Sequence, residues 1–164
     1  MTGYELAKRF DNSVGFFWRA NHQQIYRELR LLGEKKWVLG ETIAQESRPN
    51  KTVFAITEIG KNELYNWSGY QAELPSIKDE FLLKFYALDC VDIPALSLQV
   101  MQRIHQHRER LNLYQKILER HYQNEAALSR VGKGKFMGLK AGLMTERGWL
   151  AWCEDALEML KTLK

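Results

Sequence analysis

The clearest hydrophobic pattern in the chain lies between residues 22 and 34. Apolar residues recur there at positions i, i+4 and i+7, a spacing that predicts a helix with one face against a core. Asn21 is a good N-cap, and Gln24 stands at the N3 position. The apolar positions are Ile25, Leu29 and Leu32. The opposite face carries Gln23, Tyr26, Arg27 and Arg30.

A short helix is expected before this segment. Thr2 and Glu5 have capping-box spacing, and the amphipathic residues that follow continue to Phe10. The turn-forming residues 12–15 then end the helix. Two helices joined by a turn, the second with a polar face, are therefore predicted at the N-terminus.

A β-hairpin and a third helix are expected next. Extended apolar runs at 37–43 and 52–56 flank a polar, turn-forming tip at 45–51. Thr57 then caps a helix over residues 58–67. A helix-turn-helix followed by a hairpin is the winged helix-turn-helix pattern.

The second half of the chain has helical patterns only. After a linker at 71–76, we expect helices at 78–89 and from Pro94 to about Leu128. The run Gly132-Lys133-Gly134-Lys135 is interpreted as a plain loop before the last helix. Long amphipathic helices behind a small head are typical of a dimerisation arm. The predicted fold is mostly α with a small β-hairpin wing: a winged helix-turn-helix DNA-binding domain at 1–70 and a helical dimerisation domain at 77–164.

Composition excludes several classes of protein. The 164 residues are 45% hydrophobic with a formal net charge of +4, which permits a polyanionic partner without requiring one. No apolar run approaches the roughly 20 residues of a membrane span, so we expect a cytoplasmic protein without a membrane partner. Two distant cysteines and four scattered histidines do not suggest a metal site. No catalytic or nucleotide-binding motif is present, and we expect neither an enzyme nor a cofactor.

The polar face of the helix at 22–34 has the chemistry needed to contact double-stranded DNA. Gln pairs bidentately with adenine and Arg with guanine, whereas hairpin-tip cations contact the backbone or minor groove. Arg19, just before this helix, is expected at a phosphate; Tyr4 fits a phosphate contact or a structural role equally. His22 likewise fits DNA contact or packing. The candidate DNA-binding residues are Gln23, Gln24, Tyr26, Arg27, Arg30, Arg19, His22, Tyr4, Arg48 and Lys51.

Aromatic residues suggest a second, less specific site. A small aromatic effector would fit a pocket where the arm meets the head, because a ligand there could change the spacing of two recognition helices. Packing of the core or a dimer is the competing explanation for these rings. The candidate pocket residues are Trp18, Trp67, Phe85, Trp149 and Trp152. His105 and His107 lie two apart on a helix and are expected to be solvated.

Three segments also resemble the PadR family of bacterial transcriptional regulators, in particular its AphA-like branch with a larger C-terminal region. They are Gly3-Tyr4-Glu5-Leu6, the stretch 16–29 containing His22-Gln23-Gln24-Ile25-Tyr26-Arg27-Glu28-Leu29, and the hairpin stretch 49–60; Lys78–Phe81 and Trp149–Asp155 match the C-terminal region. The resemblance implies a homodimeric DNA-binding regulator, sometimes controlled by a phenolic compound. Family members usually carry an apolar helix before the Gly-Tyr-Glu motif, and that helix is expected to be missing here.

Two functional hypotheses follow. The first is a sequence-specific, homodimeric transcriptional repressor that binds a palindromic operator and responds to a small aromatic ligand. The second is a dimeric interaction module that has lost DNA binding together with the first helix.

Overall fold

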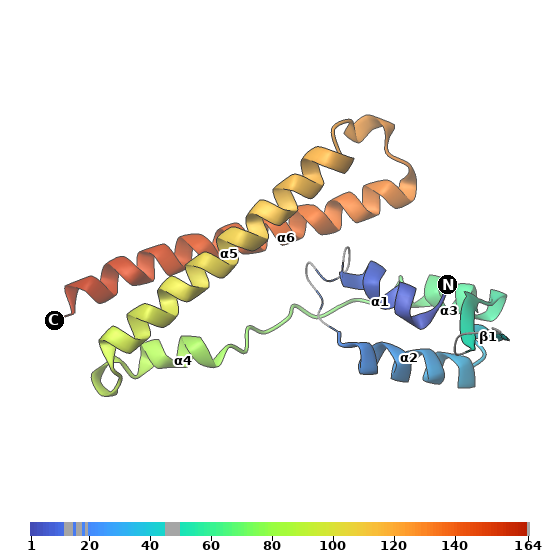
Figure 1. The fold of residues 1–164 in the computed structure, drawn as a ribbon, viewed down its shortest axis with the longest axis horizontal. Helices are drawn as coiled ribbons and strands as arrows, with labels where there is room; N and C mark the ends of the chain where they lie inside the picture. The colour runs from blue at the N-terminus through green and yellow to red at the C-terminus, as the bar shows by residue number, and fades with distance from the viewer. Residues whose placement is uncertain (12–14, 16–17, 19, 45–49, 164) are drawn as a thin grey trace. The chain divides into compact units, whose positions relative to one another are not determined.

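The structure, a computed structural model, describes residues 1–11, 15, 18, 20–44 and 50–163 (Figure 1). The chain divides into two compact units, Met1–Leu74 and Pro75–Lys164. None of the helices in the described part of the chain is both long and apolar enough to cross a membrane.

The first unit has the winged helix-turn-helix order of elements. Its strands pair antiparallel, from Val38 opposite Ile56 to Ile43 opposite Lys51. The elements are α1 (Gly3–Asp11), α2 (His22–Glu34), β1 (Val38–Ile43), β2 (Lys51–Ile56) and α3 (Glu58–Trp67). The predicted helices, hairpin and winged arrangement are confirmed.

A hydrophobic core holds α1, α2 and the hairpin together. Ala7 of α1 and Ile25 and Leu29 of α2 are buried. Partly buried residues pack around them: Leu6, Phe10, Ala20 and Phe54. The apolar face predicted for α2 therefore faces this core.

Trp18 does not belong to the buried core, contrary to the packing role considered from the sequence. It is 64% exposed, and it borders a groove between α1 and α2.

The junction from α2 to β1 is a tight Schellman turn. Lys36 has a positive φ of 57°, and its N–H donates to the carbonyl of Gly33 while the N–H of Trp37 donates to Leu32. The turn sends the chain directly from the end of α2 into the wing.

The start of α3 packs tightly against this junction. Thr57 caps α3 by accepting from the N–H of Gly60, and its hydroxyl donates to the Lys36 carbonyl at 2.7 Å. A Cβ at Gly60 would lie 2.1 Å from the Trp37 carbonyl oxygen. The close approach of these two backbones therefore requires glycine at this position.

The second unit is helical. The two long helices run antiparallel and lie side by side (Figure 1). Its elements are α4 (Glu80–Tyr86), η2 (Leu88–Cys90), α5 (Ile93–His121), η3 (Glu125–Ala127) and α6 (Arg130–Thr162).

Three boundaries predicted in this unit were wrong. The helix expected at 78–89 is shorter, Glu80–Tyr86, and is followed by the separate turn η2. The first long helix ends at His121 rather than near Leu128. The glycine and lysine run at 132–135 is not a loop but the beginning of α6, which Ser129 caps by accepting from the N–H of Gly132. Packing along a helix of 33 residues outweighs the cost of two glycines, about 1 kcal/mol each.

Among the described polar contacts that connect the helices of the second unit, two clusters involve buried or partly buried side chains. Asp79, the N-cap of α4, accepts two hydrogen bonds from Arg103 of α5, at 2.6 and 3.0 Å. The carboxylate of Glu146 on α6 contacts Nδ1 of His107 at 2.5 Å and accepts from Arg110 at 3.3 Å. Each cluster joins two elements that the apolar core also holds together.

The expectation of a solvated His107 was wrong. Its ring is buried and stacks on Trp149 at 6.1 Å. His105, in contrast, is exposed and lies 3.5 Å from Glu109 on the same helix. His107 has a buried partner on another helix, Glu146 of α6. Helical periodicity alone does not reveal such a partner.

Candidate nucleic-acid interface

The outer face of α2 is polar and open to solvent. Gln23, Tyr26, Arg27 and Arg30 are all exposed, and their spacing of i, i+3, i+4 and i+7 places them on one side of the helix. Ile25 and Leu29 anchor the opposite side in the core. The helix therefore presents amide, phenol and guanidinium groups from a fixed support.

The capping box predicted at the start of α2 is present. The N–H of Gln24 donates to Asn21 Oδ1 at 2.8 Å, and the N–H of Asn21 donates to Gln24 Oε1 at 2.8 Å. The Gln24 carbonyl oxygen is thus already used by the cap. The cap holds the side chain of Gln24 against the start of its own helix, whereas the exposed Gln23 is not part of the cap.

The two arginines of this face form ion pairs at the surface. Arg27 donates to Glu28 Oε1 at 3.0 and 3.2 Å, and Arg30 lies 3.7 Å from Glu34. All four side chains are more than half exposed. Exposed pairs of this kind contribute at most about 1 kcal/mol, so a phosphate or guanine can compete for either guanidinium.

Tyr26 has a structural contact as well as an exposed side. A Cβ placed on Gly3 would lie 2.5 Å from Tyr26 Cε1, so the ring packs directly on the first residue of α1. About half of Tyr26 remains exposed. Sequence reasoning missed this role of Gly3, although the Gly-Tyr-Glu motif drew attention to the position.

Tyr4 and His22 meet beside the start of α2. Their ring centroids are 6.3 Å apart, and both residues are exposed. Neither side chain is buried in the core. The pair is placed at the N-terminal end of the polar face, where a backbone phosphate would find helix N–H groups.

Lys51 begins β2 at the tip end of the wing, opposite Ile43, and is exposed. The Thr2 N–H that donates to Glu5 lowers the pKa of that carboxyl, and the nearby charge of Lys51 lowers it further. The side chains of Glu5 and Lys51 therefore lie close enough to interact electrostatically. Arg19 and Arg48, the other predicted backbone contacts, lie outside the described residues.

The aromatic residues proposed for an effector pocket fall into two groups. Trp18 and Trp67 belong to the first unit and are each 64% exposed. Phe85 and Trp152 line one pocket within the second unit, where their rings meet edge to face at 5.0 Å. Trp149 does not line that pocket but contacts Trp152 at 5.8 Å.

A helix with an apolar inner face and a polar outer face, followed by an antiparallel hairpin, defines a winged helix-turn-helix regulator. Residues 1–66 match the transcriptional regulator PadR-like family, and residues 77–161 match the family described as virulence activator alpha C-term. The chain belongs to the PadR-like family of transcriptional regulators.

Proteins similar to this chain support the same assignment. A Mycobacterium tuberculosis protein, described as a probable transcriptional regulator, Rv1176c, is 32% identical over 98% of this chain and 90% of its own length. The negative transcriptional regulator PadR of Bacillus subtilis is 28% identical over the same shares of the two chains.

Solved structures share the fold over nearly the whole chain. The Vibrio cholerae virulence activator AphA has a TM-score of 0.81 at 30% identity, covering 99% of this chain and 91% of that one. Bacillus subtilis PadR in complex with operator DNA has a TM-score of 0.81 at 27% identity, with coverages of 97% and 90%. The same PadR in complex with p-coumaric acid has a TM-score of 0.75 at 26% identity, with coverages of 98% and 90%.

Proposed function

We propose that this protein is a sequence-specific DNA-binding repressor that acts as a homodimer and is tuned by a small aromatic ligand. The observation that carries the proposal is the exposed polar face of α2, supported from behind by Ile25 and Leu29. A helix of this kind fits the major groove, which displays a distinct pattern of donors and acceptors for each base pair. The operator complex of Bacillus subtilis PadR supports this use of the fold.

Within that face, Gln23 and Arg27 are assigned to base edges. An amide pairs bidentately with adenine and a guanidinium with guanine. Arg30, Tyr4 and His22 lie on or beside α2 and are assigned to the phosphate backbone, as are Lys51 of the wing and, from the sequence, Arg19 and Arg48. Tyr26 supports α1 through Gly3 and can add a contact with its exposed side.

The homodimer is supported by apolar side chains left exposed on both long helices of the second unit. Large apolar surface open to water is typical of an interaction site. The residues with at least 47% exposure on these helices include Leu98, Met101, Leu113, Met137 and Met144. In a two-fold dimer the two α2 helices would reach half-sites about one DNA turn apart, roughly 10 base pairs, on a palindromic operator.

Repression is the favoured mode of action because Bacillus subtilis PadR is a negative regulator. Ligand control is supported by the p-coumaric acid complex of that protein and by the aromatic lining of the pocket in the second unit. A ligand changes operator affinity only through its differential affinity for two arrangements of the dimer, and tenfold derepression needs about 1.4 kcal/mol of coupling. The alternative of an interaction module without DNA binding is not favoured, because the relatives are transcriptional regulators.

A titration of labelled DNA with the full chain tests the proposal. The DNA is the promoter fragment upstream of the protein's own gene, compared with a scrambled duplex of equal length at several salt concentrations. We expect at least about a thousandfold preference for the promoter fragment and a linear fall of log affinity with log salt. Equal affinity for both duplexes would reject sequence-specific binding, and no binding to either would favour the interaction module.

Light scattering on the same preparation tests the assembly. A mass of twice the 19.3 kDa of one chain is expected at micromolar concentration. A stable monomer under these conditions would reject the homodimer.

A further inference from the structure

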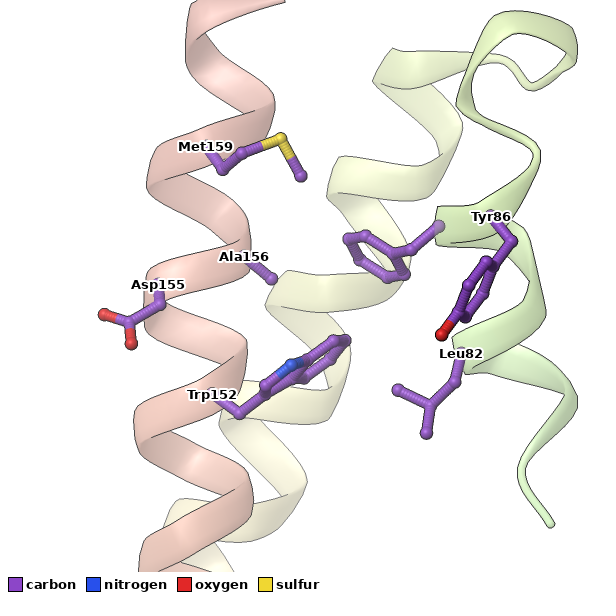
Figure 2. Close-up of a pocket in the computed structure, with 7 residues that line it drawn as sticks. Leu82, Tyr86, Trp152, Asp155, Ala156 and Met159 are labelled. Atoms are coloured by element: carbon purple, nitrogen blue, oxygen red, sulfur yellow. The ribbon is translucent and has the colours of Figure 1, made fainter. Parts of the chain in front are cut away.

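The second unit contains a pocket of about 520 Å³ between α4 and α6. Figure 2 shows Leu82 and Tyr86 of α4 and Trp152 and Met159 of α6 directed toward the space between the two helices. Its lining residues are Leu82, Phe85, Tyr86, Trp152, Asp155, Ala156 and Met159. A volume of this size falls within the range of small-molecule sites, and aromatic walls are typical of them.

The pocket has rigid walls on one side and an accessible wall on the other. Trp152 is held edge to face by Phe85 at 5.0 Å and by Phe81 at 6.1 Å. Tyr86, in contrast, is 91% exposed. An aromatic ligand could therefore lie against fixed rings and bury the exposed face of Tyr86, which gains apolar burial without rearranging the core.

The pocket has no basic group to receive an anion. None of its described lining residues is Lys, Arg or His, and its one acid, Asp155, points its carboxylate away from the cavity (Figure 2). The basic residue of α4, Lys84, donates to Gln99 of α5 at 2.5 Å. Arg103 is held by Asp79. A carboxylate placed in the pocket would lose water without gaining a cation.

We propose that this pocket binds an uncharged aromatic molecule and discriminates against the corresponding carboxylate. The inference rests on the ligand control in the proposed function and names the class of ligand. The proposed ligand is uncharged and so differs from p-coumaric acid, the compound bound in the structure of Bacillus subtilis PadR, because p-coumaric acid is ionised at neutral pH.

Calorimetric titration of the full chain without DNA tests the proposal with a matched pair of probes, methyl p-coumarate and p-coumarate, at pH 7.5. The two share a ring and differ in charge. We expect saturable binding of the ester with a Kd at least tenfold lower than that of the acid. Equal affinities, tighter binding of the acid, or no binding of the ester up to its solubility limit would each overturn the proposal.

Met159→Lys locates the site and tests the charge argument together. Met159 is 37% exposed, so a lysine of similar length can replace it while keeping its ammonium near water. The variant should bind p-coumarate at least tenfold more tightly than the wild type and the ester less tightly. The control is Met144→Lys, on the same helix at 72% exposure and outside the pocket. If the two variants behave alike, the site is elsewhere and the proposal fails.

Tyr86→Ala and Leu83→Ala form a second matched pair on the exposed side of α4. Only Tyr86 lines the pocket, so only its removal should weaken ester binding, by at least fivefold. A second copy of the chain is the competing occupant of the pocket. If Tyr86→Ala instead shifts the monomer–dimer equilibrium and neither probe binds, the pocket is an interface and the proposal is overturned. These titrations contain no DNA, so their failure leaves the operator-binding result of the same protein unaffected.

Discussion

The two units of this protein reach a folded structure in different ways. Among the described residues of the first unit, the buried core consists of Ala7, Ile25 and Leu29, and caps and a tight turn connect neighbouring segments. The second unit aligns long helices over an extended core and joins them by the buried pair of His107 and Glu146. Local backbone geometry therefore dominates in the first unit, and contacts between residues far apart in the chain dominate in the second.

The largest expected effect tests the contact across α5 and α6. Glu146→Ala leaves His107 and Arg110 without their carboxylate partner in a site where Glu146 is only 3% exposed. We expect the free energy of unfolding of the helical unit to fall by about 3–5 kcal/mol. Urea denaturation followed by circular dichroism at 222 nm measures the change.

A matched control for that variant is Glu109→Ala. Glu109 also lies near a histidine, His105, but both side chains are about 70% exposed. The expected change is below about 0.5 kcal/mol. Equal losses in the free energy of unfolding for Glu146→Ala and Glu109→Ala would show that burial of the Glu146 and His107 pair does not determine its contribution to stability.

The second effect tests the tight backbone approach in the first unit. Gly60→Ala places a Cβ 2.1 Å from the Trp37 carbonyl oxygen, and we expect a loss of about 2–3 kcal/mol from overpacking. Gly33→Ala is the control, because a Cβ there meets nothing within 4 Å; it should be neutral or stabilising by up to about 1 kcal/mol. Thermal unfolding of both variants compares them, and a harmless Gly60→Ala would contradict the close contact.

A smaller effect tests how α4 is held on α5. The hydrogen bonds from Arg103, and secondarily the Phe81 N–H, lower the pKa of the Asp79 carboxyl below its ordinary value of 3.8. Asp79→Asn should cost about 1–2 kcal/mol at neutral pH. Because the folded-state pKa is lowered, this contribution is present above the unfolded-state value and is lost as the pH falls through the folded-state value.

Stability measured from pH 7 down to pH 2 checks this dependence. The difference between wild type and Asp79→Asn should be constant above about pH 5 and shrink below pH 4. The exposed Asp89 provides the control variant Asp89→Asn. A difference that grows on acidification would have the wrong sign for a lowered pKa.

Most of the first unit could be predicted from the sequence because its signals are local. The Asn21 and Gln24 cap, the Thr57 cap and the hairpin each depend on residues only a few positions apart. The polar face of α2 could be predicted for the same reason, because its residues are three or four positions apart. The sequence did not show that Tyr26 packs on Gly3, because that contact depends on side-chain orientation.

The second unit was predicted less well because its decisive contacts are not local. Helical periodicity predicted two long amphipathic helices and a dimerisation arm, but it did not show that Leu96, Val100 and Ile104 of α5 pack within the chain, in one core with Cys153 and Leu160 of α6. It also could not show that His107 meets Glu146, 39 residues away. The glycines at 132 and 134 suggested a loop, but residues 132–135 belong to α6, whose packing outweighs the low helix propensity of glycine. Of the proposed pocket residues, Phe85 and Trp152 line one cavity, whereas the expected site between the arm and the head stays a prediction.

The central claim is that the exposed face of α2 reads base sequence while Lys51, at the tip end of the wing, contacts the phosphate backbone. The measurement that tests it most directly is the sequence preference and salt dependence of Arg27→Ala and Lys51→Ala on a set of operator variants. Arg27→Ala should relax preference at one base pair by about 1–3 kcal/mol, whereas Lys51→Ala should weaken all sequences alike and reduce the salt slope by about one. A changed sequence preference for Lys51→Ala with an unchanged preference for Arg27→Ala would contradict the account.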